Sequence, residues 1–196
     1  MWLLLAILLA AASVVLLTRG RLQGITRLRL SGAWLLVAGL IIQAVLEIVH
    51  FSRNDVTTIG YATLMGSYAL ILAFCIGNVS IRGFGVIAVG VAMNALVIGL
   101  NQGMPTKPIG TDGQGHRVFK PVEQTVKHRQ SRGDDLLGFL GDRILFPEPF
   151  NEIVSFGDLV IAVGICELVY FATRKSGRAR SLPTEDHDAL EPAPTP

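Results

Sequence analysis

The sequence predicts an all-α fold, an integral membrane bundle of five transmembrane helices, because its charge is low and unevenly distributed. Only 16% of the 196 residues are charged and 51% are hydrophobic, whereas about 25% of residues are charged in an average soluble domain. Of the 17 basic and 15 acidic residues, only Glu47, Asp158 and Glu167 fall in the apolar parts. Those parts are five runs at about 1–17, 33–50, 58–76, 84–100 and 156–173.

The length of each apolar run supports a helix that crosses a bilayer. A helix needs about 20 residues to cross a hydrocarbon core roughly 30 Å thick. No run alternates apolar and polar residues with a period of two, as barrel strands do, so we expect helices. The first run has no basic residues before it and no small-residue cleavage site after it. We therefore expect an uncleaved first helix instead of a signal peptide.

Basic residues near the ends of the runs predict an N-terminus outside and a C-terminus inside. Arg19 and Arg21 directly follow the first run, and Arg82 and Arg174 lie beside later run ends. Basic side chains this close to a helix end favour the cytoplasmic side. The expected location is the bacterial plasma membrane, which the chain crosses several times.

This orientation divides the chain into two predicted parts. Residues 1–173 form the membrane domain, including an outer loop at 101–155. Residues 174–196 form a cytoplasmic tail, whose prolines and acidic side chains predict disorder. Within the outer loop we expect one or two helical turns at 121–130 and a short amphipathic helix at 134–140.

Small residues predict which helices pack most closely. They recur at spacings of four, three and four in the third and fourth runs, at Ala62, Gly66, Ala69 and Ala73 and at Ala88, Ala92, Ala95 and Gly99. Because small side chains let two backbones approach in lipid, we expect a tight antiparallel pair. The alternative is that alanine is simply common in apolar runs.

Polar residues inside or beside the runs predict a polar cleft that opens outward. Polar groups in lipid are costly and usually face the bundle interior or a cavity. The expected cleft consists of Gln43, Glu47, His50, Asn94, Asn101 and Arg143, with Asp142 and Asp158 beside it. Structural roles are the alternative, with Glu47 paired to His50 or Arg53 and Asn94 joining two helices.

We expect no cofactor, metal or nucleic-acid site. The four histidines are not spaced like metal ligands, and both cysteines lie in apolar runs. The glycines at 110–115 lack the Gly-Lys-Ser/Thr ending of a phosphate-binding loop. A net charge of +2 is too small to indicate nucleic acid. The expected partners are the lipid bilayer and, as an open possibility, another membrane protein.

Six short segments carry a first resemblance, at 1–4, 19–21, 94–98, 101–105, 140–144 and 155–158. They resemble an uncharacterised family of small bacterial multi-pass membrane proteins, a domain of unknown function that is common in actinobacteria. The resemblance covers most of residues 1–173 and implies no activity.

The Gly-Asp-Arg at 141–143 and the Phe-Gly-Asp at 156–158, together with Asn101, carry a second resemblance. They are similar to lipoprotein signal peptidase, a family with two catalytic aspartates near the outer membrane surface. The resemblance implies a catalytic dyad of Asp142 and Asp158, in which two close carboxylates share a proton and act as acid and base. That family has four spans, however, and five are predicted here.

Three functions are compatible with these patterns. The first is a non-enzymatic membrane protein, an interaction or small-molecule-binding subunit with an outward polar cleft. The second is an aspartate-dependent membrane hydrolase, an aspartic membrane peptidase. The third is a transporter accessory subunit, although the sequence contains no inverted repeat. Carboxylates of Asp142 and Asp158 about 5–6 Å apart would favour the hydrolase.

Overall fold

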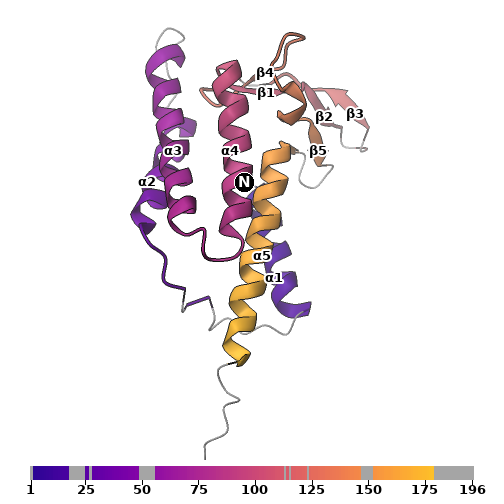
Figure 1. Cartoon of the computed structure of the whole chain (residues 1–196). Helices are drawn as coiled ribbons and strands as arrows, with labels where there is room; N and C mark the ends of the chain where they lie inside the picture. The colour runs from indigo at the N-terminus through magenta and orange to yellow at the C-terminus, as the bar shows by residue number, and fades with distance from the viewer. Residues whose placement is uncertain are drawn as a thin grey trace, which may run out of the picture.

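The computed structural model describes residues 2–17, 25–26, 28–48, 56–112, 114, 116–122, 124–146 and 152–178. This part of the chain is mostly helical and contains five α-helices (Figure 1). They are α1 (Trp2–Leu17), α2 (Ala33–Ile48), α3 (Tyr61–Gly77), α4 (Phe84–Asn101) and α5 (Phe156–Arg178). A π-helical turn, Val56–Gly60, leads into α3.

Three of the helical segments are long and apolar enough to cross a membrane. They are Thr58–Gly77, Phe84–Asn101 and Phe156–Arg174, and α2 is a shorter apolar helix. The apolar runs of the sequence therefore do become helices. The fifth helix continues past the predicted limit of 173 to Arg178, and the remainder of the predicted tail lies outside the described residues.

The helices form a bundle in which chain neighbours are not always packing neighbours. Helix α2 packs on α3, α3 on α4 and α4 on α5, while α1 packs on α5. The strands gather at one end of this bundle, next to the end of α4 and the start of α5 (Figure 1).

The closest helix contact is between α4 and α5, where glycines face each other. A Cβ atom added to Gly90 would lie 2.6 Å from the carbonyl oxygen of Gly157, and one added at Gly83, just before α4, would lie 2.6 Å from that of Gly164. Gly83 and Gly90 are seven residues apart, as are Gly157 and Gly164, and their pairing shows that α4 and α5 are antiparallel. Such close backbone contact supplies dispersion and packing energy between the two helices.

The prediction that small residues of α3 form the contact with α4 is wrong. Ala62, Gly66, Ala69 and Ala73 are all exposed, so the small face of α3 points away from the bundle. The two helices do pack, but through larger groups. Tyr61 donates a hydrogen bond to the carbonyl of Gly99 at 2.8 Å, and the rings of Phe74 and Phe84 meet edge to face at 5.3 Å.

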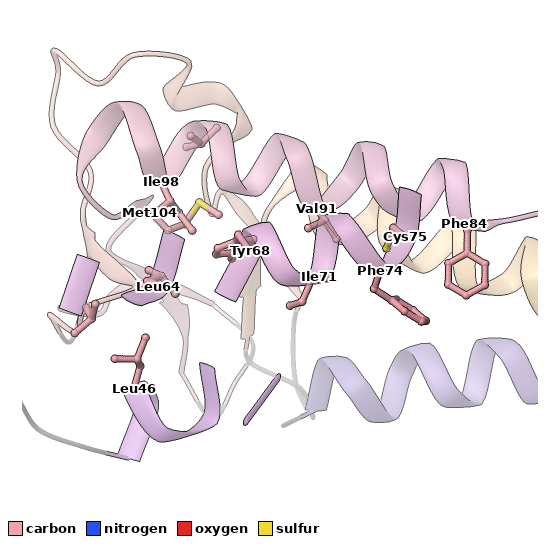
Figure 2. Close-up of a cluster of buried hydrophobic side chains, with 12 residues drawn as sticks. Leu46, Leu64, Tyr68, Ile71, Phe74, Cys75, Phe84, Val91, Ile98 and Met104 are labelled. Atoms are coloured by element: carbon pink, nitrogen blue, oxygen red, sulfur yellow. The ribbon is translucent and has the colours of Figure 1, made fainter. Parts of the chain in front are cut away.

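The hydrophobic core lies mainly between α2, α3 and α4 and continues into the strands. Figure 2 shows Leu64, Tyr68 and Ile71 of α3 beside Val91 and Ile98 of α4, with Met104 reaching in from β1. Leu64, Ile98 and Met104 are at most 1% exposed. Because Met104 and Val126 belong to this core, the strand region is anchored to the helices by apolar packing.

Among the described residues, six strands of three residues each lie within 101–155, where a loop was expected, so the all-α prediction holds only for the bundle. Strand β1 (Met104–Thr106) pairs in parallel with β4 (His128–Gln130). The antiparallel pairs are β2 (Ile109–Thr111) with β3 (Arg117–Phe119), and β5 (Ile144–Phe146) with β6 (Glu152–Val154). We call this region, 102–155, the strand cap.

In the described part of the strand cap, the two helical elements that were expected at 121–130 and 134–140 are not formed. Residues 128–130 are a strand, and the segment 134–140 contains only a 3₁₀ turn, Gly138–Leu140. Leu137, just before that turn, has a φ of 52°, a left-handed conformation that interrupts a right-handed helix. The long-range pairing of β1 with β4 determines the fold here, and local residue patterns do not reveal it.

The glycine contact predicts that an added methyl group is harmful at Gly90 and harmless at Gly66. At Gly90 the methyl group would overlap the backbone of α5, whereas at Gly66 nothing lies within 4 Å. We expect Gly90→Ala to lower the free energy of unfolding by about 1–3 kcal/mol and Gly66→Ala to leave it unchanged or raise it. Thermal unfolding of the two variants in detergent tests this; equal effects would contradict the assigned α4–α5 interface.

Candidate functional site

Buried and half-buried polar side chains collect where the strand cap meets the helices, and they form two hydrogen-bonded groups. The first, the helix-junction cluster, consists of Asn94, Ser155 and Asp158. The second, the pocket cluster, consists of Thr106, His128 and Asp142. Helices α4 and α5 and strands β1 and β4 contribute residues to these groups, so the site depends on how the strands are placed on the helices.

The helix-junction cluster begins α5 and ties it to α4. The Ser155 hydroxyl accepts a hydrogen bond from the Asp158 amide at 3.1 Å, and the Asp158 carboxylate accepts one from the Ser155 amide at 3.0 Å. This reciprocal arrangement is a capping box, which satisfies two free amides at a helix start. Asn94 of α4 closes the cluster by donating to Asp158 at 2.8 Å and accepting from Ser155 at 2.9 Å.

The pocket cluster is built around the buried carboxylate of Asp142, which is 3% exposed. Its Oδ2 accepts a hydrogen bond from the Thr106 hydroxyl at 2.9 Å and lies 3.0 Å from Nδ1 of His128. The backbone of Asp142 forms a bridge to Thr106. A Cβ at Gly141 would lie 2.4 Å from the carbonyl oxygen of Pro105, so the Gly-Asp sequence is required for this close approach to β1.

A pocket of about 280 Å³ opens beside the pocket cluster. Its charged side chains are Glu47 from the end of α2, Asp142, Glu152 of β6, and Lys120. Thr106, Thr125 and His128 add polar groups, and the rest of the lining is apolar. The lining contains three acidic side chains and one lysine, Lys120. When His128 is neutral, the net charge of the lining is therefore negative.

Lys127, which precedes His128, lies among the acidic groups of both clusters. Burial alone would lower the pKa of its ammonium group. The neighbouring acidic groups, which are the Tyr68 hydroxyl and the carboxyl groups of Asp158, Asp142 and Glu47, outweigh that effect, and the net pKa is raised. Lys127 therefore remains positively charged and offsets part of the negative charge behind the pocket.

A third polar group stabilises the outer side of the strand cap. Asn101 accepts a hydrogen bond from the Leu136 amide and donates to the Leu136 carbonyl, at 2.9 and 2.8 Å. Arg129 donates to the Asn101 carbonyl and forms a salt bridge with Asp135. Burial would raise the pKa of Asp135, but hydrogen bonds from Arg132 and Arg129 and their charges hold that pKa below its usual range.

The structure brings only part of the predicted cleft together. Glu47 and Asp142 line the pocket, and Asn94 and Asp158 meet at the helix junction. Gln43 instead donates to Ser67 at 3.2 Å between α2 and α3, and Asn101 braces the outer side of the cap. Arg143 is absent from the pocket lining, and its buried Nε has no hydrogen-bond partner within the described residues. His50 lies outside the described residues.

Sequence reasoning missed Thr106, Lys127 and His128 as members of the site. His128 is adjacent to Asp142 only because β4 pairs with β1, in the register Met104 with His128. No spacing in the sequence indicates that pairing, since the two strands are short and their partners are distant. Among the described residues, no group of three or more His, Cys, Asp or Glu side chains is arranged to hold a metal ion.

The carboxylates of the proposed dyad have separate partners. Asp142 is engaged by Thr106 and His128, whereas both oxygens of Asp158 accept hydrogen bonds at the helix junction. What the two share is an electrostatic interaction with Lys127. A dyad needs its two carboxyl groups to share one proton, and the hydrogen bonds described here hold each group to its own cluster.

The fold and the site define a class of protein, a helical bundle with membrane-length apolar helices and a strand cap that carries a polar pocket. Comparison of the sequence with known families gives a match over residues 27–170 to a family of unknown function, DUF5317. The chain belongs to this family, which confirms the resemblance to an uncharacterised domain of unknown function. No curated protein and no solved structure matches the chain.

The lowered pKa of Asp135 predicts a stability that depends on pH. A carboxylate with a lowered pKa contributes stability above its unfolded pKa of about 4 and loses it as the pH falls through the folded value. We expect Asp135→Asn to reduce the free energy of unfolding by about 2 kcal/mol at pH 7, with a smaller difference from wild type below pH 4.

Thermal unfolding of both proteins across pH 3–8 measures this difference. Asp134→Asn, at the exposed neighbouring residue, removes the same charge and should have little effect. A similar loss in both variants, or a loss in Asp135→Asn that does not shrink in acid, would contradict the role of the Arg129–Asp135 pair.

Proposed function

We propose that this chain is a multi-pass protein of the bacterial plasma membrane that binds a small, amine-bearing polar molecule in the pocket of its strand cap. The observation that carries the proposal is the pocket itself, where Asp142 is held in place and Glu47 and Glu152 add negative charge. All five helices cross the bilayer in this proposal, and the strand cap faces outward.

The apolar surface of the bundle supports the membrane placement. Large apolar side chains are exposed on successive helices, among them Trp34 at 69%, Ile76 at 63% and Val163 at 62%. Exposed apolar area on this scale marks an interaction surface, and lipid is the environment that suits apolar helices. Arg29, Arg82 and Arg174 are exposed at the end away from the strand cap, which favours that end as cytoplasmic.

The chemistry of the pocket supports an amine as the ligand. A protonated amine pairs with carboxylates through short, charge-assisted hydrogen bonds. The volume of about 280 Å³ is at the low end for ligand pockets, so the molecule is small. Lys120, the threonines and His128 provide further groups that hydroxyl or carboxylate oxygens of such a molecule would contact.

The arrangement of the aspartates supports binding over hydrolysis. The Asp158 carboxylate already accepts hydrogen bonds from Asn94 and from its own capping box, and Asp158 does not line the pocket. Of the two aspartates, only Asp142 lines the pocket. This division of roles fits a ligand site at Asp142 and a structural junction at Asp158.

Binding is tested with three molecules of similar length and different charge. Putrescine carries two positive charges, 1,4-butanediol carries none, and succinate carries two negative charges. We expect putrescine at saturation to raise the thermal unfolding temperature of the full chain in detergent by about 3 °C or more. Butanediol and succinate should give no rise, because neither supplies an ammonium group to the carboxylates.

Two variants separate pocket binding from a general effect of charge. Glu47 is an exposed residue at the pocket rim, so Glu47→Gln should fold and lose most of the putrescine effect. Asp134→Asn removes an acidic group that does not line the pocket and should retain the effect. An equal rise with succinate or butanediol, or an unchanged putrescine effect in Glu47→Gln, would overturn the proposal.

A further inference from the structure

A second pocket, of about 440 Å³, lies at the end of the bundle opposite the strand cap. We call it the basal pocket. The loop before α2, the turn between α3 and α4, and the last turns of α5 form its walls. Leu28, Ile81, Leu168 and Phe171 make most of the lining apolar, while Ser80 and Arg82 supply polar groups.

The basal pocket has a fixed framework. The side chain of Asn78 accepts a hydrogen bond from the Ser31 amide and donates to the Ser31 carbonyl, both at 2.9 Å. It also donates to the Phe74 carbonyl at the end of α3 at 2.8 Å. Asn78 is 3% exposed. This buried side chain therefore joins the loop before α2 to the turn after α3 and keeps two walls of the pocket together.

Arg82 is positioned by an aromatic ring at the pocket wall. Its guanidinium carbon lies 4.5 Å from the centre of the Phe171 ring, a cation–π contact between the turn before α4 and helix α5. Arg82 remains exposed, and within the described residues it forms no salt bridge. A guanidinium that stacks through its face still has N–H groups at its edge, which match the oxygens of a phosphate.

The surroundings of the pocket are positively charged. Arg29 and Arg174 are exposed at the same end, and Arg174 stacks on Tyr170 at 4.7 Å. The acidic residue nearby in the described part of α5 is Glu167. Among the described residues, three arginines against one carboxylate give this end a local excess of positive charge.

We propose that the basal pocket binds an anionic phospholipid, with an acyl chain along the apolar wall and the phosphate at Arg82 and Ser80. The proposal rests on the membrane placement proposed above, which puts Leu168 and Phe171 at the depth where acyl chains meet headgroups. Apolar walls beside an arginine match the two halves of such a lipid, and basic pockets between membrane helices are a recurring headgroup site. A free phosphate ion would satisfy Arg82 but leave the apolar walls exposed.

The test measures lipid retention by the full chain purified in detergent. The protein is mixed with equal amounts of phosphatidylglycerol and phosphatidylcholine with identical acyl chains, and bound lipid is counted by native mass spectrometry. We expect about a fivefold preference for phosphatidylglycerol. The preference should fall to near one in Arg82→Gln, recover partly in Arg82→Lys, and persist in Arg117→Gln, where the arginine lies in the strand cap.

A second variant tests the pocket without changing Arg82, in case the Arg82 substitutions impair folding. Ser80 is exposed and lines the pocket, so Ser80→Trp fills the pocket without changing its charge and should also abolish the preference. Inorganic phosphate in excess should leave the bound phosphatidylglycerol in place. Equal retention of the two lipids, insensitivity to both variants, or displacement by phosphate would overturn the lipid proposal.

A failure of the lipid site can be distinguished from a failure of the proposed membrane placement. If the chain is recovered from cells in the aqueous fraction without detergent, that placement fails and the lipid site fails with it. If the chain requires detergent but shows no lipid preference, only the basal-pocket proposal fails. Putrescine binding at the strand cap is independent of both lipid variants.

Discussion

The half-buried carboxylate of Asp158 needs hydrogen-bond donors, and this requirement organises the junction between the helices and the strand cap. Its donors are the Ser155 amide and the Asn94 side chain, so α5 can begin only where α4 presents Asn94. The neighbouring glycine is part of the same constraint. A Cβ at Gly157 would lie 2.0 Å from Oδ1 of Asn94, so a larger residue would displace the asparagine. The Gly-Asp sequence at 157–158 is thereby explained without invoking catalysis.

The position of the pocket follows from that junction. Strand β6 ends at Val154, immediately before Ser155, so fixing the start of α5 also fixes Glu152 at the pocket wall. Its partner strand β5 leads back to Asp142, which β1 holds through Thr106 and Pro105. The Gly-Asp sequences at 141–142 and 157–158 therefore act alike: the glycine permits a close backbone approach, and the aspartate accepts the hydrogen bonds that this approach brings within reach.

The sequence predicts the helices well and the strand cap poorly, for physical reasons. Helices that are apolar over many turns are visible in composition, and Asn94 and Asp158 stand out because polar groups are rare in such runs. A strand of three residues has too few positions to show alternation, and the β1–β4 pairing is non-local. Glu47 and Asp142 could therefore be named from their types, whereas His128 and Lys127 required the fold. The small-residue pattern on α3 was misleading because spacing alone does not distinguish an exposed stripe from a packing face.

The most direct test of this account is a double-mutant cycle between Asn94 and Asp158, measured as free energies of unfolding in detergent. If the two side chains form one cluster, the double variant Asn94→Ala/Asp158→Ala should lose less stability than the sum of the single variants, with a coupling of about 1–3 kcal/mol. Single-variant losses that add within about 0.5 kcal/mol would contradict the claim that this junction holds the strand cap on the bundle.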